Sequence, residues 1–294
     1  MGPLRCAFAG RFMAPLVALL FTVATIPPAT AQPLTWSSDD VYVRVVDVGA
    51  GLCAVTVAPG DKVMVYDAGR WDNNFCSDAV RELVPEGGDI DLLVLSHSDA
   101  DHIGEVDTIL AEHPVHLILR TGHVRVTDTW GNANQAIADA VAQGASVINL
   151  RTMPIEPGTT FSLGPAEVTF VAGWHEWPEP AGLSLAERRN VISIVVRLEF
   201  EGNAVLFTGD TVGRRIGDPP HACQEAEKVM VDNAEAVPLK SAVIIAPHHG
   251  ADNASARCFI QPSIRSASSS PPAMRTVTRG RAQPNGITLA TASS

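Results

Sequence analysis

Four side chains that can bind metal ions fall within six consecutive residues. They are His97, Asp99, Asp101 and His102, in the segment S-H-S-D-A-D-H-I-G at 96–104, directly after the apolar run L-L-V-L at 92–95. Two imidazoles and two carboxylates so close together cannot all share one face of a strand or helix, but they can converge in a loop. Neutral imidazole and carboxylate bind divalent cations. The segment therefore predicts a metal site at the end of a buried strand rather than a solvated turn.

Two more polar clusters follow apolar runs in the same way. T-G-D at 208–210 follows the run 204–207 and presents Asp210. P-H-H-G at 247–250 follows the run 242–246 and presents His248 and His249. Each motif by itself is common in turns. Because catalytic residues lie on loops that rigid elements hold in place, the three clusters together predict one composite site.

The elements that would position these clusters are mostly strands. Apolar runs rich in β-branched residues predict strands at 41–46, 52–57, 62–66, 92–95, 115–119, 147–150, 167–171, 191–200, 204–207 and 242–246. Helical patterns cover 77–83, 103–110 and 133–142. Hairpins interleaved with helices indicate an α/β sandwich in which helices cover sheets.

The N-terminal segment 1–31 has the features of a secretory signal peptide. It carries two arginines and no acid, then an apolar run at 13–26 and the residues A-T-A at 29–31. The apolar run has about 14 residues, fewer than the roughly 20 of a spanning helix, which favours cleavage near Gln32 over a retained anchor. We expect a secreted or periplasmic protein with no stable membrane anchor after cleavage.

Export changes how the cysteines are interpreted. Cys53, Cys76, Cys223 and Cys258 remain after cleavage and allow three pairings in an oxidising compartment. The chain has no C-x-x-C spacing, which argues against a structural zinc knuckle. The sequence predicts at least one disulfide, and Cys53 and Cys258 are equally consistent with buried free thiols.

The chain divides into segments of opposite charge. Its 294 residues have a net charge of −11, and the 46% of hydrophobic residues excludes wholesale disorder. Two arginines lie in the leader and four in the tail 262–294, which has no acid, so the body 32–261 carries 15 basic and 32 acidic residues, a net charge of −17. That charge disfavours long-range attraction of nucleic acids. The tail has the composition of a basic low-complexity segment.

The three motifs, in their order along the chain, resemble those of the metallo-β-lactamase superfamily: H-x-D-x-D-H, T-G-D and P-H-H-G. The motifs V-D-V-G-x-G at 46–51, Y-D-x-G at 66–69 and N-x-x-S at 190–193 resemble its branch containing the hydrolase domain of ComEC-type DNA-uptake proteins. The resemblance covers about residues 41–260 and makes 32–261 the hydrolase domain. It implies the metallo-β-lactamase fold, an αβ/βα four-layer sandwich, with two divalent metal ions, usually zinc, in the groove between the sheets.

The resemblance also implies a ligand set. His97 and Asp99 look like ligands of the first metal, Asp101 and His102 like ligands of the second, and Asp210 like the carboxylate that bridges both. The superfamily's common H-x-H-x-D-H has histidine where this chain has Asp99. A site richer in carboxylates is harder, so manganese becomes a rival to zinc.

The last ligand should come from the P-H-H-G motif. Its alignment with the superfamily's P-x-H-G favours His249 and leaves His248 to contact the substrate or the leaving oxygen, but the opposite assignment stays open. Asp67 resembles the strand-end aspartate that orients the ligand loop through hydrogen bonds. The superfamily's mid-chain histidine is absent, and Asn190 stands near its place.

These features predict an exported, dinuclear metal-dependent hydrolase with Asp101 and His248 as candidate catalytic residues. Two metals roughly 3.5–4 Å apart would share and acidify a water, and the bridging hydroxide would attack a small-molecule or phosphodiester substrate. One alternative is a hydrolase of lactones, β-lactams or other carboxylic derivatives. Another is a catalytically decayed binding module.

The tail raises a separate hypothesis about the reading frame. The resembled branch continues after P-H-H-G with a strand, a Ser-x-Gly-His-like turn and a His-Pro pair. Reading GC-rich codons for residues 266–281 in a shifted frame yields Ser-Ala-Gly-His and His-Pro, although the codons were selected for that match. We hypothesise that the native frame is lost near residue 262, which sequencing of the encoding DNA decides.

Overall fold

The computed structural model describes residues 37–85, 87–178, 182–264 and 274–279, the last of these as backbone. The expected signal peptide and most of the tail lie outside these residues. No helix of the described part is long and apolar enough to cross a membrane.

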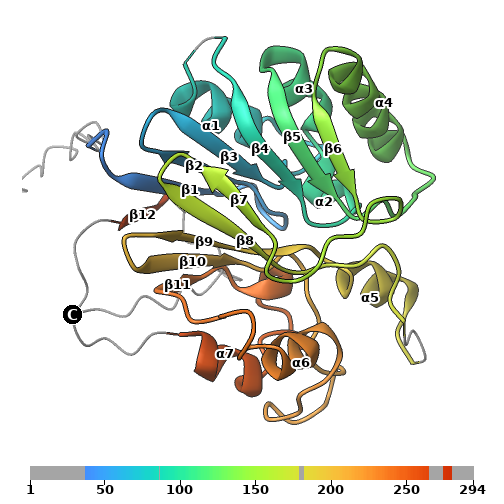
Figure 1. Cartoon of the computed structure of the whole chain (residues 1–294). Coiled ribbons are helices and arrows are strands. Elements are labelled where there is room, and N and C mark those ends of the chain that lie inside the picture. Colours follow the sequence, from blue (N-terminus) through green and yellow to red (C-terminus); the bar gives the residue numbers. More distant parts are fainter. Residues whose placement is uncertain (1–36, 86, 179–181, 265–273, 280–294) are drawn as a thin grey trace, which may run out of the picture. The chain divides into compact units, whose positions relative to one another are not determined.

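Two sheets form the centre of the fold (Figure 1). The seven-stranded sheet has the order β12-β1-β2-β3-β4-β5-β6, and the five-stranded sheet has the order β11-β10-β9-β8-β7. The strands of the first are β1 Val41–Val46, β2 Ala54–Ala58, β3 Lys62–Tyr66, β4 Ile90–Leu95, β5 Val115–Arg120, β6 Ser146–Asn149 and β12 Met274–Arg279. Those of the second are β7 Thr160–Leu163, β8 Ala166–Ala172, β9 Val195–Phe200, β10 Asn203–Phe207 and β11 Val243–Ile244.

Helices cover the outer face of each sheet (Figure 1). The helices are α1 Phe75–Leu83, α2 Ala100–Ile103, α3 Val106–Glu112, α4 Asp128–Ala142, α5 Leu185–Asn190, α6 Glu225–Asp232 and α7 Arg257–Ser263. α1, α3 and α4 pack on the first sheet, and α6 and α7 pack on the second. The order of helices, sheet, sheet and helices confirms the predicted four-layer αβ/βα sandwich.

The central strand β4 shows why the sequence folds this way. Side chains alternate across a strand, so a strand buried on both faces must be apolar at every position. Leu93 and Leu95 pack against the helix layer, whereas Leu92 and Val94 face the core between the two sheets. β3, β4, β5 and β6 are mutually parallel, and so their carboxyl ends meet at one edge.

The structure corrects several predicted boundaries. The predicted helix 103–110 is two helices, α2 and α3, separated at Gly104. A Cβ atom on Gly104 would lie 2.1 Å from the backbone carbon of Arg70, so the chain turns here to pass that segment closely. The predicted strand 191–200 starts only at Val195, because α5 precedes it. β7, α5, α6 and α7 were not predicted, and neither was β12, which pairs in parallel with β1.

Two disulfides resolve the cysteine pairing that the sequence left open. Cys53 is bonded to Cys76 and Cys223 to Cys258. The prediction of at least one disulfide is confirmed, and the alternative of free thiols at Cys53 and Cys258 is wrong. Each bond joins positions that meet only in the folded chain, 23 and 35 residues apart.

Candidate metal centre

The three polar clusters meet where strands of both sheets end. The first follows β4, the second follows β10, and the third forms a 3-10 turn, Pro247–Gly250, after β11. β10 and β11 are parallel neighbours, so their carboxyl ends lie together. The backbone N–H of Ile194 donates to the carbonyl oxygen of Ser96 at 2.8 Å, which ties the loop after β4 to the second sheet.

Asp210 lies at the centre of the cluster. Its Oδ1 is 3.2 Å from Nε2 of His102, and its Oδ2 is 3.3 Å from Nε2 of His249 and 4.0 Å from Nε2 of His97. Oδ2 of Asp101 is 3.6 Å from Nε2 of His249. The structure thus brings together five of the six predicted ligands.

These five residues fit the binding of divalent cations. Their ligand atoms form two groups, each within 4.8 Å, namely His97 with His102 and Asp210, and Asp101 with His102 and His249. Nε2 of His97 is buried and has no hydrogen-bond partner among the described residues, although buried polar atoms are normally satisfied. A set of imidazole nitrogens and carboxylate oxygens suits zinc or manganese.

Opposite charges in the cluster shift the pKa values of its members strongly. Burial disfavours the charged forms, but Asp210 and Asp67 hold the pKa of His102 well above its usual range. Against the same effect of burial, Asp101 and Asp210 raise the pKa of His249 to about 9, and His249 and His102 lower the pKa of Asp101 to about 2. A metal ion must displace the protons on these imidazoles, so metal affinity should rise with pH.

Asp67 holds the ligand loop after β4 through hydrogen bonds, as the resemblance implied. It is fully buried, and its carboxylate accepts hydrogen bonds from the N–H and the Oγ–H of Ser96, each at 2.7 Å. The same carboxylate lies 2.7 Å from Nδ1 of His102. The proton on Nδ1 is therefore held toward Asp67, which directs Nε2 of His102 at Asp210.

Gly209 permits the close approach of Asp210. Its φ is +53°, and a Cβ atom there would lie 2.7 Å from Cβ of Ser96 and 2.9 Å from Cβ of Ser193. The hydroxyl of Ser193 also accepts a hydrogen bond from the backbone N–H of Asp210 at 3.1 Å. Glycine and serine in these motifs thus let the two sheets meet at the carboxylate.

Asp99 has partners that the sequence analysis did not identify. Its Oδ1 accepts from Nε of Arg189 at 2.7 Å and from a terminal nitrogen of Arg125. Asp99 belongs to neither group of clustered ligand atoms. Arg125 and Arg189 are 26 and 90 residues from Asp99 in sequence, so no local spacing points to this contact.

His248 faces the cluster between two asparagines. Its Nδ1 is 2.7 Å from Oδ1 of Asn253, and its Nε2 is 2.9 Å from Nδ2 of Asn190. This pattern assigns the Nδ1–H tautomer and leaves Nε2 as the basic nitrogen, 4.0 Å from Oδ2 of Asp210. Asn190 was noted in the sequence, whereas Asn253, three residues after P-H-H-G, was missed.

The chain is similar to several known proteins. The beta-lactamase superfamily domain matches residues 63–243. Recombination protein 2 of Haemophilus influenzae is 34% identical over 116 residues, which are 38% of this chain and 13% of that protein. The chain therefore spans only a small part of the length of this curated relative.

Solved structures are also similar. The metallo-beta-lactamase fold protein YhfI from Bacillus subtilis aligns over 54% of this chain and 55% of its own, with 18% identity and a TM-score of 0.34. A metallo-beta-lactamase with a HARLDQ motif from Cronobacter sakazakii aligns over 66% of this chain and 70% of its own, with 15% identity and a TM-score of 0.40.

Proposed function

The chain belongs to the beta-lactamase superfamily, and from this we propose that it is an exported hydrolase that holds two divalent metal ions and cleaves phosphodiester bonds. The observation that carries the proposal is the convergence of His97, His102 and His249 on Asp210. Three imidazoles and a buried carboxylate so close together are a typical donor set for a divalent metal ion.

The residues that would hold the ions are those that the structure clusters. His97, Asp101, His102, Asp210 and His249 would supply them. His102 belongs to both groups of clustered ligand atoms, and the resemblance makes Asp210 the carboxylate that both ions would share. Asp99 stays a candidate ligand of the first ion through Oδ2, because both guanidinium groups donate to Oδ1. When bound, such ions lower the pKa of water and polarise the oxygen atoms of an ester.

The chain's own residues supply the remaining chemistry. The Nδ1–H of His248 donates to Asn253, so Nε2 is the nitrogen that takes up a proton and returns it to a leaving oxygen. The hydrogen bond from Asn190 to Nε2 holds the ring in place until substrate replaces it. Oδ2 of Asp101 and Nε2 of His249 lie 3.6 Å apart, so the two side chains would bind the same cation together.

Cations beside the site favour phosphodiesters over neutral esters. Arg125 and Arg189 reach Asp99 from two separate segments, so two guanidinium charges face a single carboxylate. Arginine pairs well with the oxygens of phosphate. The acidic body opposes long-range attraction of nucleic acids, so the proposal concerns small phosphodiesters.

The test uses the full chain expressed from sequence-verified DNA. Zinc- or manganese-loaded protein is assayed on bis(p-nitrophenyl) phosphate and on a chromogenic cephalosporin, beside Asp210→Ala and the distant control Asp91→Asn. We expect phosphodiester cleavage that Asp210→Ala abolishes and Asp91→Asn keeps. Cleavage of the cephalosporin alone would favour the lactam alternative. No turnover, together with equal metal content in wild type and Asp210→Ala, would favour a binding module.

Export is tested separately. We expect the protein from the periplasm or the medium to begin near Gln32. An intact N-terminus in the membrane fraction would contradict export with cleavage.

A further inference from the structure

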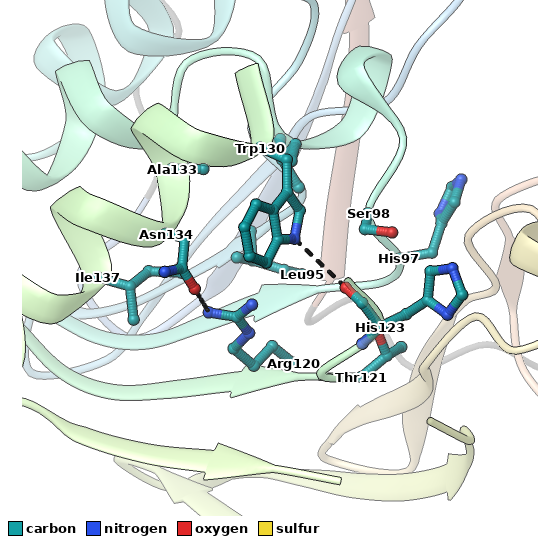
Figure 2. A pocket seen from close by; sticks show the side chains of 11 residues that line it. Leu95, His97, Ser98, Arg120, Thr121, His123, Trp130, Ala133, Asn134 and Ile137 are labelled. Carbon is teal, nitrogen blue, oxygen red and sulfur yellow. Dashed lines mark hydrogen bonds between the residues drawn. The ribbon is translucent and has the colours of Figure 1, made fainter. Parts of the chain in front are cut away.

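A pocket opens beside the metal centre, between the carboxyl end of β5 and helix α4 (Figure 2). His97 and Ser98 line one side of it. Its apolar wall consists of Leu95, Ile103, Trp130, Ala133 and Ile137. Its remaining polar lining consists of Arg120, Thr121, His123 and Asn134. The pocket therefore shares a ligand residue with the proposed reaction site but extends away from it.

Arg120 is a partly buried cation without an acid. Its guanidinium donates to Oδ1 of Asn134 at 3.1 Å, and the two side chains point toward each other in Figure 2. Among the described residues, no carboxylate lies within ion-pair distance of it. Burial lowers the pKa of Arg120. A cation shielded from water without an anion costs free energy, which an anionic ligand would recover.

Ser98 offers a hydroxyl donor without a partner among the described residues. Its side chain is buried, with 7% exposed, and its Oγ has no hydrogen-bond partner among the described residues. The position of Ser98 between His97 and Asp99 places this hydroxyl at the border of the pocket and the metal centre. A buried hydroxyl without a partner is uncommon in folded proteins.

Two further guanidinium groups, of Arg125 and Arg189, act on His123 at the pocket although the body is acidic. His123 lines the pocket, and burial together with Arg189 and Arg125 lowers its pKa. Asp99 opposes this effect but already pairs with both arginines. Two guanidinium groups thus share the one carboxylate of Asp99, and Arg120 has no acidic partner among the described residues.

We propose that this pocket binds a terminal phosphate of the substrate, held by Arg120 and the hydroxyl of Ser98. The inference rests on the proposed function and narrows it to short phosphodiesters that carry a phosphate monoester near the scissile bond. Arginine binds phosphate through two parallel N–H groups, and a neighbouring hydroxyl adds a third donor.

The first experiment measures binding without catalysis. Thermal unfolding of the EDTA-treated full chain is followed as sodium phosphate replaces sodium chloride at constant ionic strength. We compare wild type with Arg120→Gln, Ser98→Ala and the control Arg151→Gln, which removes the same charge from an exposed position beside the pocket. Losing a hydrogen bond to a charged group lowers affinity about 10- to 100-fold.

We expect phosphate to raise the unfolding midpoint of wild type and Arg151→Gln, and to raise that of Arg120→Gln only at far higher concentrations. Arg120→Gln should fold, because it removes an unpaired cation and keeps an amide donor for Asn134. An equal phosphate response in Arg120→Gln and wild type would overturn the proposal. Ser98→Ala gives an independent reading, since it removes only the hydroxyl.

The second experiment uses metal-loaded protein and two substrates that differ by one group. They are the p-nitrophenyl ester of thymidine 5′-phosphate with and without a 3′-phosphate. We expect wild type and Arg151→Gln to prefer the 3′-phosphorylated ester in kcat/KM by about tenfold or more, and Arg120→Gln to lose that preference. Turnover of both esters without preference would refute the pocket and leave the proposed function standing. A phosphate response that depends on Arg120, with no turnover of either ester, would refute the function and leave the pocket as a phosphate site.

Discussion

Replacing Asp67 by asparagine should separate folding from metal binding. Asparagine has nearly the shape of aspartate and tolerates the left-handed backbone at this position, where φ is +58°. Its carbonyl oxygen can accept from the N–H of Ser96, but its amide group then faces Nδ1 of His102. Because an amide N–H can only donate, Nδ1 of His102 must accept the hydrogen bond and cannot carry a proton. The proton of neutral His102 then moves to Nε2, which is the nitrogen that would bind a cation.

The expected magnitudes follow from the hydrogen bonds lost. Asp67 is fully buried and lies 2.7 Å from Nδ1 of His102, so the pair is shielded from solvent. A hydrogen bond to a charged group contributes about 1.5–3 kcal/mol, and we expect the unfolding free energy to fall by about 2 kcal/mol. Metal affinity should fall about 10- to 100-fold, because the orienting partner of a ligand is lost.

Two measurements test this prediction at pH 7. Urea unfolding in EDTA reports the stability of the metal-free chain, and competition with a chromophoric chelator reports zinc affinity. Asp91→Asn is the matched control, because Asp91 also accepts a backbone N–H, from Val63 at 2.8 Å, but lies away from the cluster. It should lose some stability and keep the zinc affinity of wild type. Wild-type zinc affinity in Asp67→Asn would refute the tautomer argument.

The other predictions concern stability. Burial raises the pKa of the Glu227 carboxyl to about 7, although hydrogen bonds from the backbone N–H groups of Ser255 and Ala256 lower it. The protonated carboxyl therefore contributes to the free energy of unfolding at low pH, and this contribution is lost as the pH rises through 7. Wild type should therefore lose about 2–3 kcal/mol relative to Glu227→Gln between pH 4.5 and 8 in urea titrations, and parallel pH profiles would contradict this. Replacing both Cys53 and Cys76 by alanine should cost about 3 kcal/mol by chain entropy, and a reductant should then destabilise wild type more than this variant. Gly209→Ala should cost about 3 kcal/mol from backbone strain and overpacking, and unchanged urea unfolding would show that the sheets can separate there.

Local sequence patterns predicted the strands that carry the site. β1 and β3 have the predicted bounds, because short alternating runs between turn residues leave little freedom of register. The patterns failed where tertiary contacts decide. Val191 and Ile192 are β-branched and apolar, but they follow α5 and are buried in a cluster with Trp177 rather than in a strand. Their burial resembles that of a strand, and nothing in the local sequence distinguishes the two.

The candidate site was predictable in its residue types but not in its contacts. The spacing of His97, Asp101 and His102 directly after an apolar run indicated a cation site, and the structure does cluster them. The arginines at Asp99 were not predictable, because side chains distant in sequence meet only when loops from different elements fold over the same edge.

The sequence by itself determined which strands end in side chains that can bind metal, because apolar runs predict buried strands and the polar residues after them predict where the strands end. Only the tertiary structure decided which of those side chains lie close together. His249, rather than His248, turns its Nε2 toward Asp101 and Asp210, whereas His248 is held by Asn190 and Asn253. Adjacent residues in left-handed backbone point in different directions, and their partners come from the opposite sheet and from a later loop. The physical reason is that the stacking of two sheets, and not any local spacing, sets the distances across their shared edge.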